Sequence, residues 1–168
     1  ANEESFYCRP LRLDENKQPA RMGIPEHATK AKVALLPPMS GLTDREFIKQ
    51  PGEIGVLIGQ GQTAQVLRNL CYRVCWPDDK VAKPSADWIA LTGQLSRLFG
   101  VKLLNPKFVA ERSEIVMEYE EKSGTRLDLS SSGRGLQQTL LILAHLYANP
   151  RTVLLLDEPD AHLEVLRQ

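Results

Sequence analysis

Four consecutive apolar residues near the end of the chain, Val153–Leu156, constrain the fold more than any other stretch. The run is too short for the core of a helix, and a proline lies a few residues away on each side of it. Such a run is typical of a strand that is buried on both faces in a parallel sheet. Asp157 and Glu158 follow directly, at the end of the strand where open α/β sheets bind their ligands.

These two carboxylates suggest phosphoryl-transfer chemistry. An Asp in the position of Asp157 holds Mg²⁺ in P-loop NTPases, directly or through water. Glu158 points elsewhere and can polarise a water molecule for attack on a phosphoryl group. The alternative is a strand that ends in two solvated acids, because short motifs of this kind also occur by chance.

A serine- and glycine-rich turn precedes the helical pattern that leads to this strand. Ser130–Ser132 stand just before leucines that recur at helical spacing from Leu136 to Leu146. Serine is a good N-cap, and a helix N-terminus attracts phosphate. Gly133 and Gly135 allow the backbone to approach a ligand closely. The alternative for this turn is an ordinary capped helix.

The order of strand, Ser/Gly turn, helix, strand and Asp-Glu is more specific than either motif alone. The segments LDLSSSGRGLQQTL at 127–140 and TVLLLDEPDAHL at 152–163 resemble the signature motif and the Walker B motif of ABC-type ATPases. Within that class, the C-terminal third is similar to the SMC/RecF/OLD branch, and most of all to OLD-like bacterial AAA-family ATPases.

The resemblance assigns a role to each residue of the Walker B motif and of the D-loop after it. Asp157 is expected to bind magnesium, and Glu158 is expected to be the catalytic base. Asp160 and His162 are expected to lie in the D-loop, at the seam between two ATPase heads.

The resemblance also places the signature turn. Ser131, Ser132 and Gly133 are expected to contact the nucleotide bound to the partner subunit, and Ser131 with Gly133 fits the signature position best. A serine replaces the first glycine of the usual Leu-Ser-Gly-Gly-Gln pattern. Arg134 stands where the wider class has Gln or Glu.

A Gly-x-x-x-x-Gly-Lys-Ser/Thr motif is missing from the 168 residues. Because this P-loop cradles the phosphates of a bound nucleotide, the chain alone is expected to bind nucleotide weakly and to be inactive. The sequence therefore predicts a partial ATPase head, with the Walker A lobe cut off or supplied elsewhere. The resemblance implies that a further strand and a switch histidine follow Gln168.

The predicted fold is α/β: a partial P-loop NTPase (ABC-type) head with a mostly parallel sheet, a helical insertion and a β-hairpin before the signature helix. The chain is interpreted as one partial head domain over 1–168. Strands at 5–13 and 32–36, separated by a loop, and a Q-loop-like region make up 1–41; 42–104 is a helical subdomain. A hairpin occupies 113–129, and the signature helix, Walker B strand and D-loop occupy 130–168.

Two helices are expected in the helical subdomain. The first carries an apolar stripe from Val66 to Val74, with Arg68 and Arg73 off the stripe; both arginines are interpreted as solvated, the alternative being contact with phosphate or a partner. The second begins at Ser85 and ends at Gly100. Cysteines are common core residues, so Cys71 and Cys75 are expected to pack in the core rather than bind metal.

Charge, hydropathy and cysteine content narrow the range of protein classes. Twenty-one basic and 21 acidic residues give no net charge, so there is no global attraction to nucleic acid. No apolar run approaches the roughly 20 residues that span a membrane. An odd number of cysteines, three, fits a reducing cytoplasmic compartment rather than a disulfide framework.

The predicted function is ATP binding and hydrolysis by a homodimer of heads with ATP and Mg²⁺. The resemblance couples it to a nuclease or other DNA-handling effector, in DNA repair or phage defence. One alternative is a non-catalytic degenerate head that acts as a dimerisation or docking module. The other is a direct nucleic-acid binder, which a steep salt dependence of binding would reveal.

Overall fold

The computed structural model describes residues 11–21, 30, 32–39, 41–78 and 83–158, and it divides the chain into two compact units, 1–32 and 33–168. In the first unit, β1 (Leu11–Leu13) pairs antiparallel with β2 (Pro19–Arg21). The Asp14 carboxylate holds the turn between them by accepting hydrogen bonds from two backbone N–H groups. A loop was expected over 14–30, and β2 corrects that expectation. The part of the first predicted strand before residue 11 lies outside the described residues.

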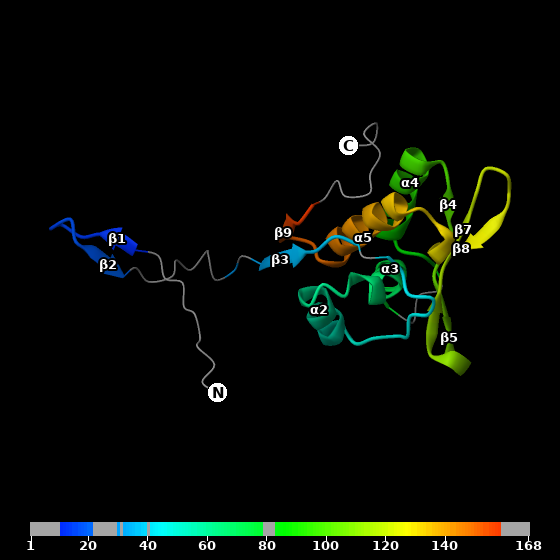
Figure 1. The fold of residues 1–168 in the computed structure, drawn as a ribbon, viewed down its shortest axis with the longest axis horizontal. Helices are drawn as coiled ribbons and strands as arrows, with labels where there is room; N and C mark the ends of the chain where they lie inside the picture. The colour runs from blue at the N-terminus through cyan, green and yellow to red at the C-terminus, as the bar shows by residue number, and fades with distance from the viewer. Residues whose placement is uncertain (1–10, 22–29, 31, 40, 79–82, 159–168) are drawn as a thin grey trace. The chain divides into compact units, whose positions relative to one another are not determined.

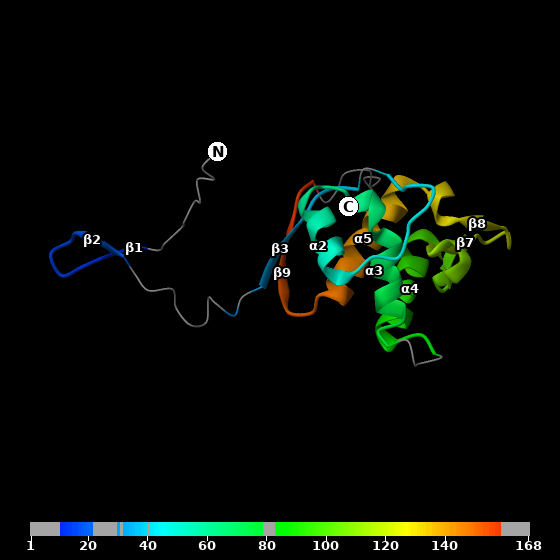
Figure 2. The ribbon, with the colours of Figure 1, turned by 90° about the horizontal axis from the view of Figure 1, so that it is seen from below.

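A two-stranded parallel sheet joins the two ends of the second unit. It consists of β3 (Lys32–Leu36) and β9 (Thr152–Leu156), which lie side by side in Figure 2. The backbone N–H of Asp157, just after β9, donates to the carbonyl of Leu36 at the end of β3, with N and O 3.3 Å apart. The carboxyl ends of both strands therefore lie at one edge of the sheet.

One face of this sheet is bare, which corrects the expectation that β9 is buried on both faces. Val153 and Leu155 of β9 are 57% and 52% exposed, and Val33 and Leu35 of β3 are exposed as well. The opposite face packs on the core through Leu36 and Leu154. The physical reason is that, among the described residues, β3 and β9 pair only with each other and no element covers their outer face.

Helices surround the core of the second unit (Figure 1). Ser85 caps α4 by accepting the N–H of Trp88 at 3.0 Å, and Gly100 ends the helix with φ of 69°, as the sequence predicts. The first helix of this unit was not predicted. The helices are α2 (Pro51–Gly59), α3 (Leu67–Cys75), α4 (Ala86–Phe99) and α5 (Arg134–Ala148), with short 3₁₀ turns η1 (Thr63–Gln65), η2 (Ala110–Arg112) and η3 (Leu129–Ser131).

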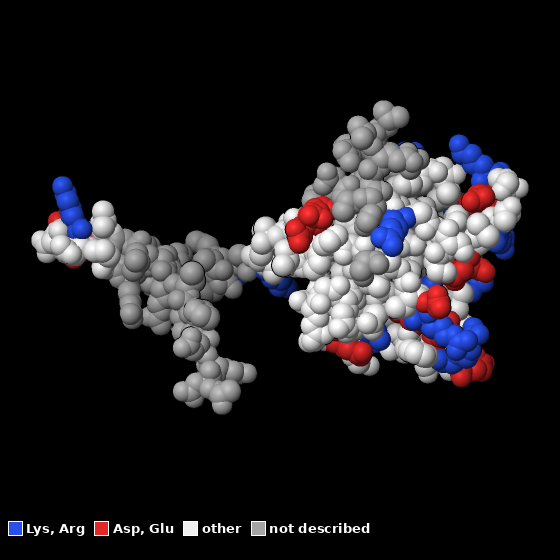
Figure 3. All heavy atoms as spheres, in the orientation of Figure 1, with Lys and Arg blue, Asp and Glu red and all other residues white. Residues whose placement is uncertain are grey.

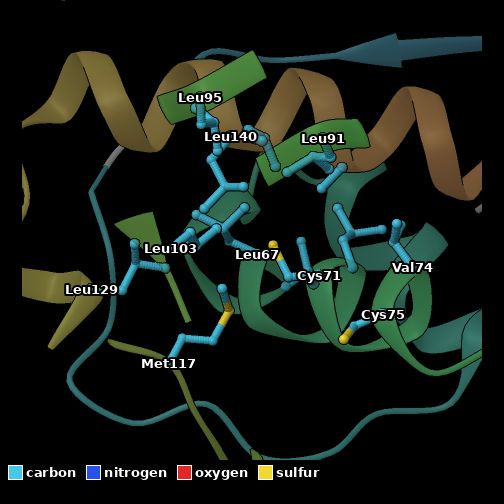
Figure 4. Close-up of a cluster of buried hydrophobic side chains, with 14 of the residues drawn as sticks. Leu67, Cys71, Val74, Cys75, Leu91, Leu95, Leu103, Met117, Leu129 and Leu140 are labelled. Atoms are coloured by element: carbon cyan, nitrogen blue, oxygen red, sulfur yellow. The ribbon is translucent and has the colours of Figure 1, made fainter. Parts of the chain in front are cut away.

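The core lies where α3 and α4 pack against α5. Figure 4 shows leucines of α3, α4 and α5 pointing into one cluster, closed on one side by Leu103 and Met117. The predicted stripe of α3 faces this cluster. Cys71 and Cys75 are buried in it as free thiols, which confirms their interpretation as core residues.

Short antiparallel strands make up the rest of the unit. One sheet has the order β4 (Lys102–Leu103), β7 (Glu118–Glu120) and β8 (Arg126–Asp128). A second sheet pairs β5 (Lys107–Val109) with β6 (Glu114–Val116). The chain passes directly from β8 into η3 and then into α5, so this sheet positions the Ser/Gly turn. None of the described helices is long and apolar enough to cross a membrane.

Candidate functional site

The first half of the candidate site is the edge of the sheet where β3 and β9 both end. Asp157 and Glu158 are exposed there, directly after β9. Glu158 has φ of 45°, a backbone conformation that is uncommon for residues other than glycine. Non-glycine residues with such backbone angles often mark functional sites, because the surrounding structure must hold them there.

The chemistry of these carboxylates fits a magnesium ion bound together with a nucleotide. Mg²⁺ keeps several waters and takes one or two carboxylates plus substrate phosphates, rather than a cage made only of protein. In the described part of the chain, no group of three or more acidic, histidine or cysteine side chains is placed so that it could hold a metal ion. Asp157 and Glu158 could therefore contribute only part of a coordination shell. Asp160 and His162 lie outside the described residues.

The second half of the candidate site is the turn before α5. Ser130 and Ser131 are exposed in η3, and Ser132 is almost buried. The Oγ of Ser132 donates to the carbonyl of Leu129 at 2.7 Å. It is thus occupied within the turn.

The helix cap differs from the sequence expectation. Gly133 is the N-cap of α5 and offers no side chain to the first N–H groups of the helix. The serines were expected to cap this helix. Instead, Ser130 and Ser131 lie in η3 and Ser132 ends it, so the cap position falls on Gly133. The first N–H groups of α5 therefore have no side-chain acceptor, and an anion is attracted to such a helix end.

A buried amide links the two halves. The Oε1 of Gln138, on α5, accepts the backbone N–H of Met39 at 2.5 Å. Met39 follows β3 by three residues, so the segment that leaves the sheet beside Asp157 is fastened to the helix that follows the turn. Sequence analysis missed Gln138; its only signal is a polar residue among the leucines of an apolar helix.

A buried polar cluster supports the turn from the side of α3, and it corrects the interpretation of Arg68 as a solvated charge. Arg68 is 1% exposed. Its guanidinium donates to the Thr43 carbonyl at 2.8 Å and to the Asp128 carboxylate at 3.0 Å. The side chain of Arg68 therefore reaches from α3 to the loop at Thr43 and to the residue just before η3. Arg73 is exposed, as expected.

Glu46 completes this cluster. Its carboxylate accepts the backbone N–H groups of Arg68 and Asn69 at 2.9 and 2.6 Å, and the Asn69 side-chain amide at 2.7 Å. Burial raises the pKa of Glu46, although the hydrogen bonds from Asn69 and Arg68 and the charge of Arg68 act against that rise. The charged and polar groups of this cluster pair with one another and with the nearby backbone, so they stabilise the fold.

A separate pocket of about 610 Å³ lies beside β5, with aromatic walls formed by Tyr72, Trp76 and Phe108. None of the predicted site residues that the structure describes lines it. On the face shown in Figure 3, basic and acidic side chains are interspersed, and no broad area of one sign is visible among the described residues. This mixture matches the zero net charge and gives no support to direct binding of nucleic acid.

One comparison with known proteins identifies a family. Residues 45–168 match the model of a family described as an AAA domain, AbiEii toxin-like, of a type IV TA system. The match includes the Ser/Gly turn, α5, β9 and the two carboxylates. No curated protein and no solved structure matches the chain.

Proposed function

This chain belongs to the AbiEii toxin-like AAA domain family, a family of P-loop NTPases, and we propose that it supplies the signature, Walker B and D-loop parts of an ATP-hydrolysing, ABC-type head of the OLD-like branch. Two such heads would bind ATP and Mg²⁺ between them as a homodimer. The dimer would drive a nuclease or other DNA-handling effector, in repair or phage defence.

One observation carries the proposal. Asp157 and Glu158 stand exposed at the carboxyl end of a parallel strand pair, and the segment leaving that pair is hydrogen-bonded to the helix behind the Ser/Gly turn. Ligands of open α/β sheets bind at this edge. A strand that ended in solvated acids by chance would not also need a buried link to the signature helix.

The residues divide the chemistry between them. Asp157 would hold Mg²⁺, which neutralises charge on the phosphates. Glu158 would accept a proton from the attacking water. Ser131 and Gly133, beside the uncapped start of α5, would donate hydrogen bonds to the γ-phosphate held by the partner head. Catalysis of this kind is positioning and charge stabilisation.

Glu158→Gln tests the proposal in a protein that carries this domain together with a phosphate-binding loop. Hydrolysis of Mg-ATP should fall about 10²- to 10⁴-fold, the usual contribution of a general base. The affinity for ATP should stay the same, because the side chain does not hold the nucleotide. Glu111→Gln, a neutralised exposed carboxylate on η2, is the matched control. Equal hydrolysis by the Glu158→Gln protein and the wild type would exclude Glu158 as the base.

A second candidate, a non-catalytic docking module, is favoured by the missing P-loop and by the bare apolar face of β3 and β9. In that case hydrolysis of Mg-ATP by the assembled protein does not depend on Glu158, and Val153→Lys on the bare face abolishes the association of this chain with an ATPase partner. Hydrolysis that depends on Glu158 would exclude this candidate.

A further inference from the structure

The side chain of Arg68 is buried, whereas its partner Asp128 is partly exposed. Its guanidinium donates hydrogen bonds to two protein oxygens, those of the Thr43 carbonyl and the Asp128 carboxylate. A guanidinium is costly to remove from water unless its donors are paired, and a buried ion pair adds little net stability over apolar residues of similar size. A buried arginine of this kind is best explained by the geometry that it imposes.

That geometry concerns the turn before α5. The carboxylate oxygen that receives Arg68 also accepts the backbone N–H of Ser130 at 2.8 Å, so Asp128 is the N-cap of η3. Burial raises the pKa of Asp128, but the hydrogen bonds from Ser130 and the charge of Arg68 outweigh burial and lower it. Asp128 is therefore ionised at neutral pH.

Other contacts fix the shape of the turn and its attachment to α5 and to the sheet. Ser132 donates to Leu129, the amide of Gln137 donates to the Ser132 carbonyl at 3.0 Å, and the N–H of Leu129 donates to the Met117 carbonyl at 2.9 Å. The Arg68–Asp128 pair adds a link from the turn to α3. Through this link the position of η3 depends on α3 and on the segment around Thr43.

We propose that Arg68 is a positioning residue which, through Asp128, holds the signature turn at the place where Ser131 and Gly133 contact the partner's nucleotide. This inference rests on the proposed function. A catalytic group that moves by about 1 Å can lose on the order of 10²-fold in rate. Breaking the pair should therefore lower kcat, with little change in the affinity of each head for ATP.

The test compares two substitutions of Asp128, whose side chain is partly exposed and tolerates change. Asp128→Ala removes the shared acceptor, whereas Asp128→Asn keeps an oxygen for both Ser130 and Arg68. The matched control is Arg126→Ala, which breaks an exposed Arg–carboxylate pair with Glu120 on the neighbouring strands without reaching the turn.

The wild type and each variant are made in a protein that carries this domain together with a phosphate-binding loop, and two measurements are made on each. Hydrogen–deuterium exchange of a peptide covering 129–133 reports the mobility of the turn, and steady-state hydrolysis gives kcat and KM for ATP. We expect Asp128→Ala to speed exchange at least tenfold and to lower kcat 10- to 100-fold at unchanged KM. Asp128→Asn should have an exchange rate and a kcat close to those of the wild type. Arg126→Ala should match the wild type in both.

The inference and the proposed function fail in different ways. If Glu158→Gln abolishes hydrolysis but Asp128→Ala retains the wild-type kcat or the wild-type exchange rate, the positioning role of Arg68 is wrong while the ATPase proposal stands. If Asp128→Asn is as slow as Asp128→Ala, the effect is loss of charge rather than of position, and the inference is also wrong. If the wild type hydrolyses no ATP, both fall together.

Discussion

Glu46 offers the sharpest test of how this fold is held together. It is 2% exposed and lies in the loop before α2, yet its carboxylate serves the first turn of α3. The N-cap residue of α3, Val66, has no side-chain acceptor for these N–H groups. Glu46 therefore caps α3 although it lies 22 residues away from Arg68 along the chain.

The size of the effect follows from the three donors that meet this carboxylate. Glu46→Ala leaves the N–H groups of Arg68 and Asn69 and the Asn69 amide without an acceptor, and each buried unpaired donor costs about 1–3 kcal/mol. Part of that loss is offset because a carboxylate no longer has to be buried. We expect a net loss of about 3 kcal/mol in the free energy of unfolding. Glu46→Gln keeps one acceptor oxygen for Asn69 and should cost about 1–2 kcal/mol.

Urea unfolding at pH 7, followed by circular dichroism, measures both losses as shifts of the midpoint at constant slope. The control is Glu53→Ala on α2, which removes only an exposed pair with Lys49 and should change stability by less than about 0.5 kcal/mol. A loss below about 1 kcal/mol for Glu46→Ala, or a larger loss for Glu46→Gln than for Glu46→Ala, would refute the capping argument.

Three further outcomes are expected. Gly100→Ala forces alanine into φ of 69° with its Cβ 2.8 Å from the Lys122 side chain, and should cost about 1 kcal/mol or more in a thermal or urea melt, whereas Gly93→Ala inside α4 has open space and should stabilise by about 0.5–1 kcal/mol. Burial lowers the pKa of His145 below the ordinary 6.5, and neither ring nitrogen has a partner among the described residues. Its neutral form is thus the one that fits the fold. Stability is retained above pH 6.5 and lost as the pH falls below it, so the wild type should weaken relative to His145→Phe between pH 7.5 and 5.5; parallel pH profiles would contradict this. Burial also raises the pKa of Cys71, and that of Cys75 to about 12, so mass spectrometry after iodoacetamide treatment at pH 8 should find both thiols unmodified in the folded protein and modified in urea.

Features encoded in a short window could be predicted from the sequence. The helix from Ser85 to Gly100 has a start signal, an apolar stripe and a stop signal within 16 residues, and the structure has it with those caps. The strand at 152–156 and its two acids could be predicted for the same reason. The stripe of α3 also follows from spacing alone.

The polar supports of the site could not be predicted, because their partners are far apart in the chain. Arg68 meets Asp128 across 60 residues, and Gln138 meets Met39 across 99. The helical spacing of the apolar residues shows that Arg68 lies off the apolar stripe of α3. It does not show that another segment of the chain covers Arg68. The local pattern around Ser130–Ser132 favours a capped helix equally well with or without η3, so the position of the cap also depends on the tertiary fold.

The bare face of β3 and β9 is where the sequence and the structure differ most, and the difference is itself informative. Val153 and Leu155 have the apolar character of core residues, yet they are exposed. The missing phosphate-binding motif and this bare face are explained together if one further element brings the motif and covers the face. Within the chain itself, Val153→Lys should then change the free energy of unfolding by less than about 0.5 kcal/mol, while Leu154→Ala on the opposite, packed face should cost about 1–3 kcal/mol. In a protein that carries the phosphate-binding loop, the same Val153→Lys should become strongly destabilising, because it would bury an unpaired charge. Equal small effects of Val153→Lys in both proteins would show that the face stays in water and that the added element lies elsewhere.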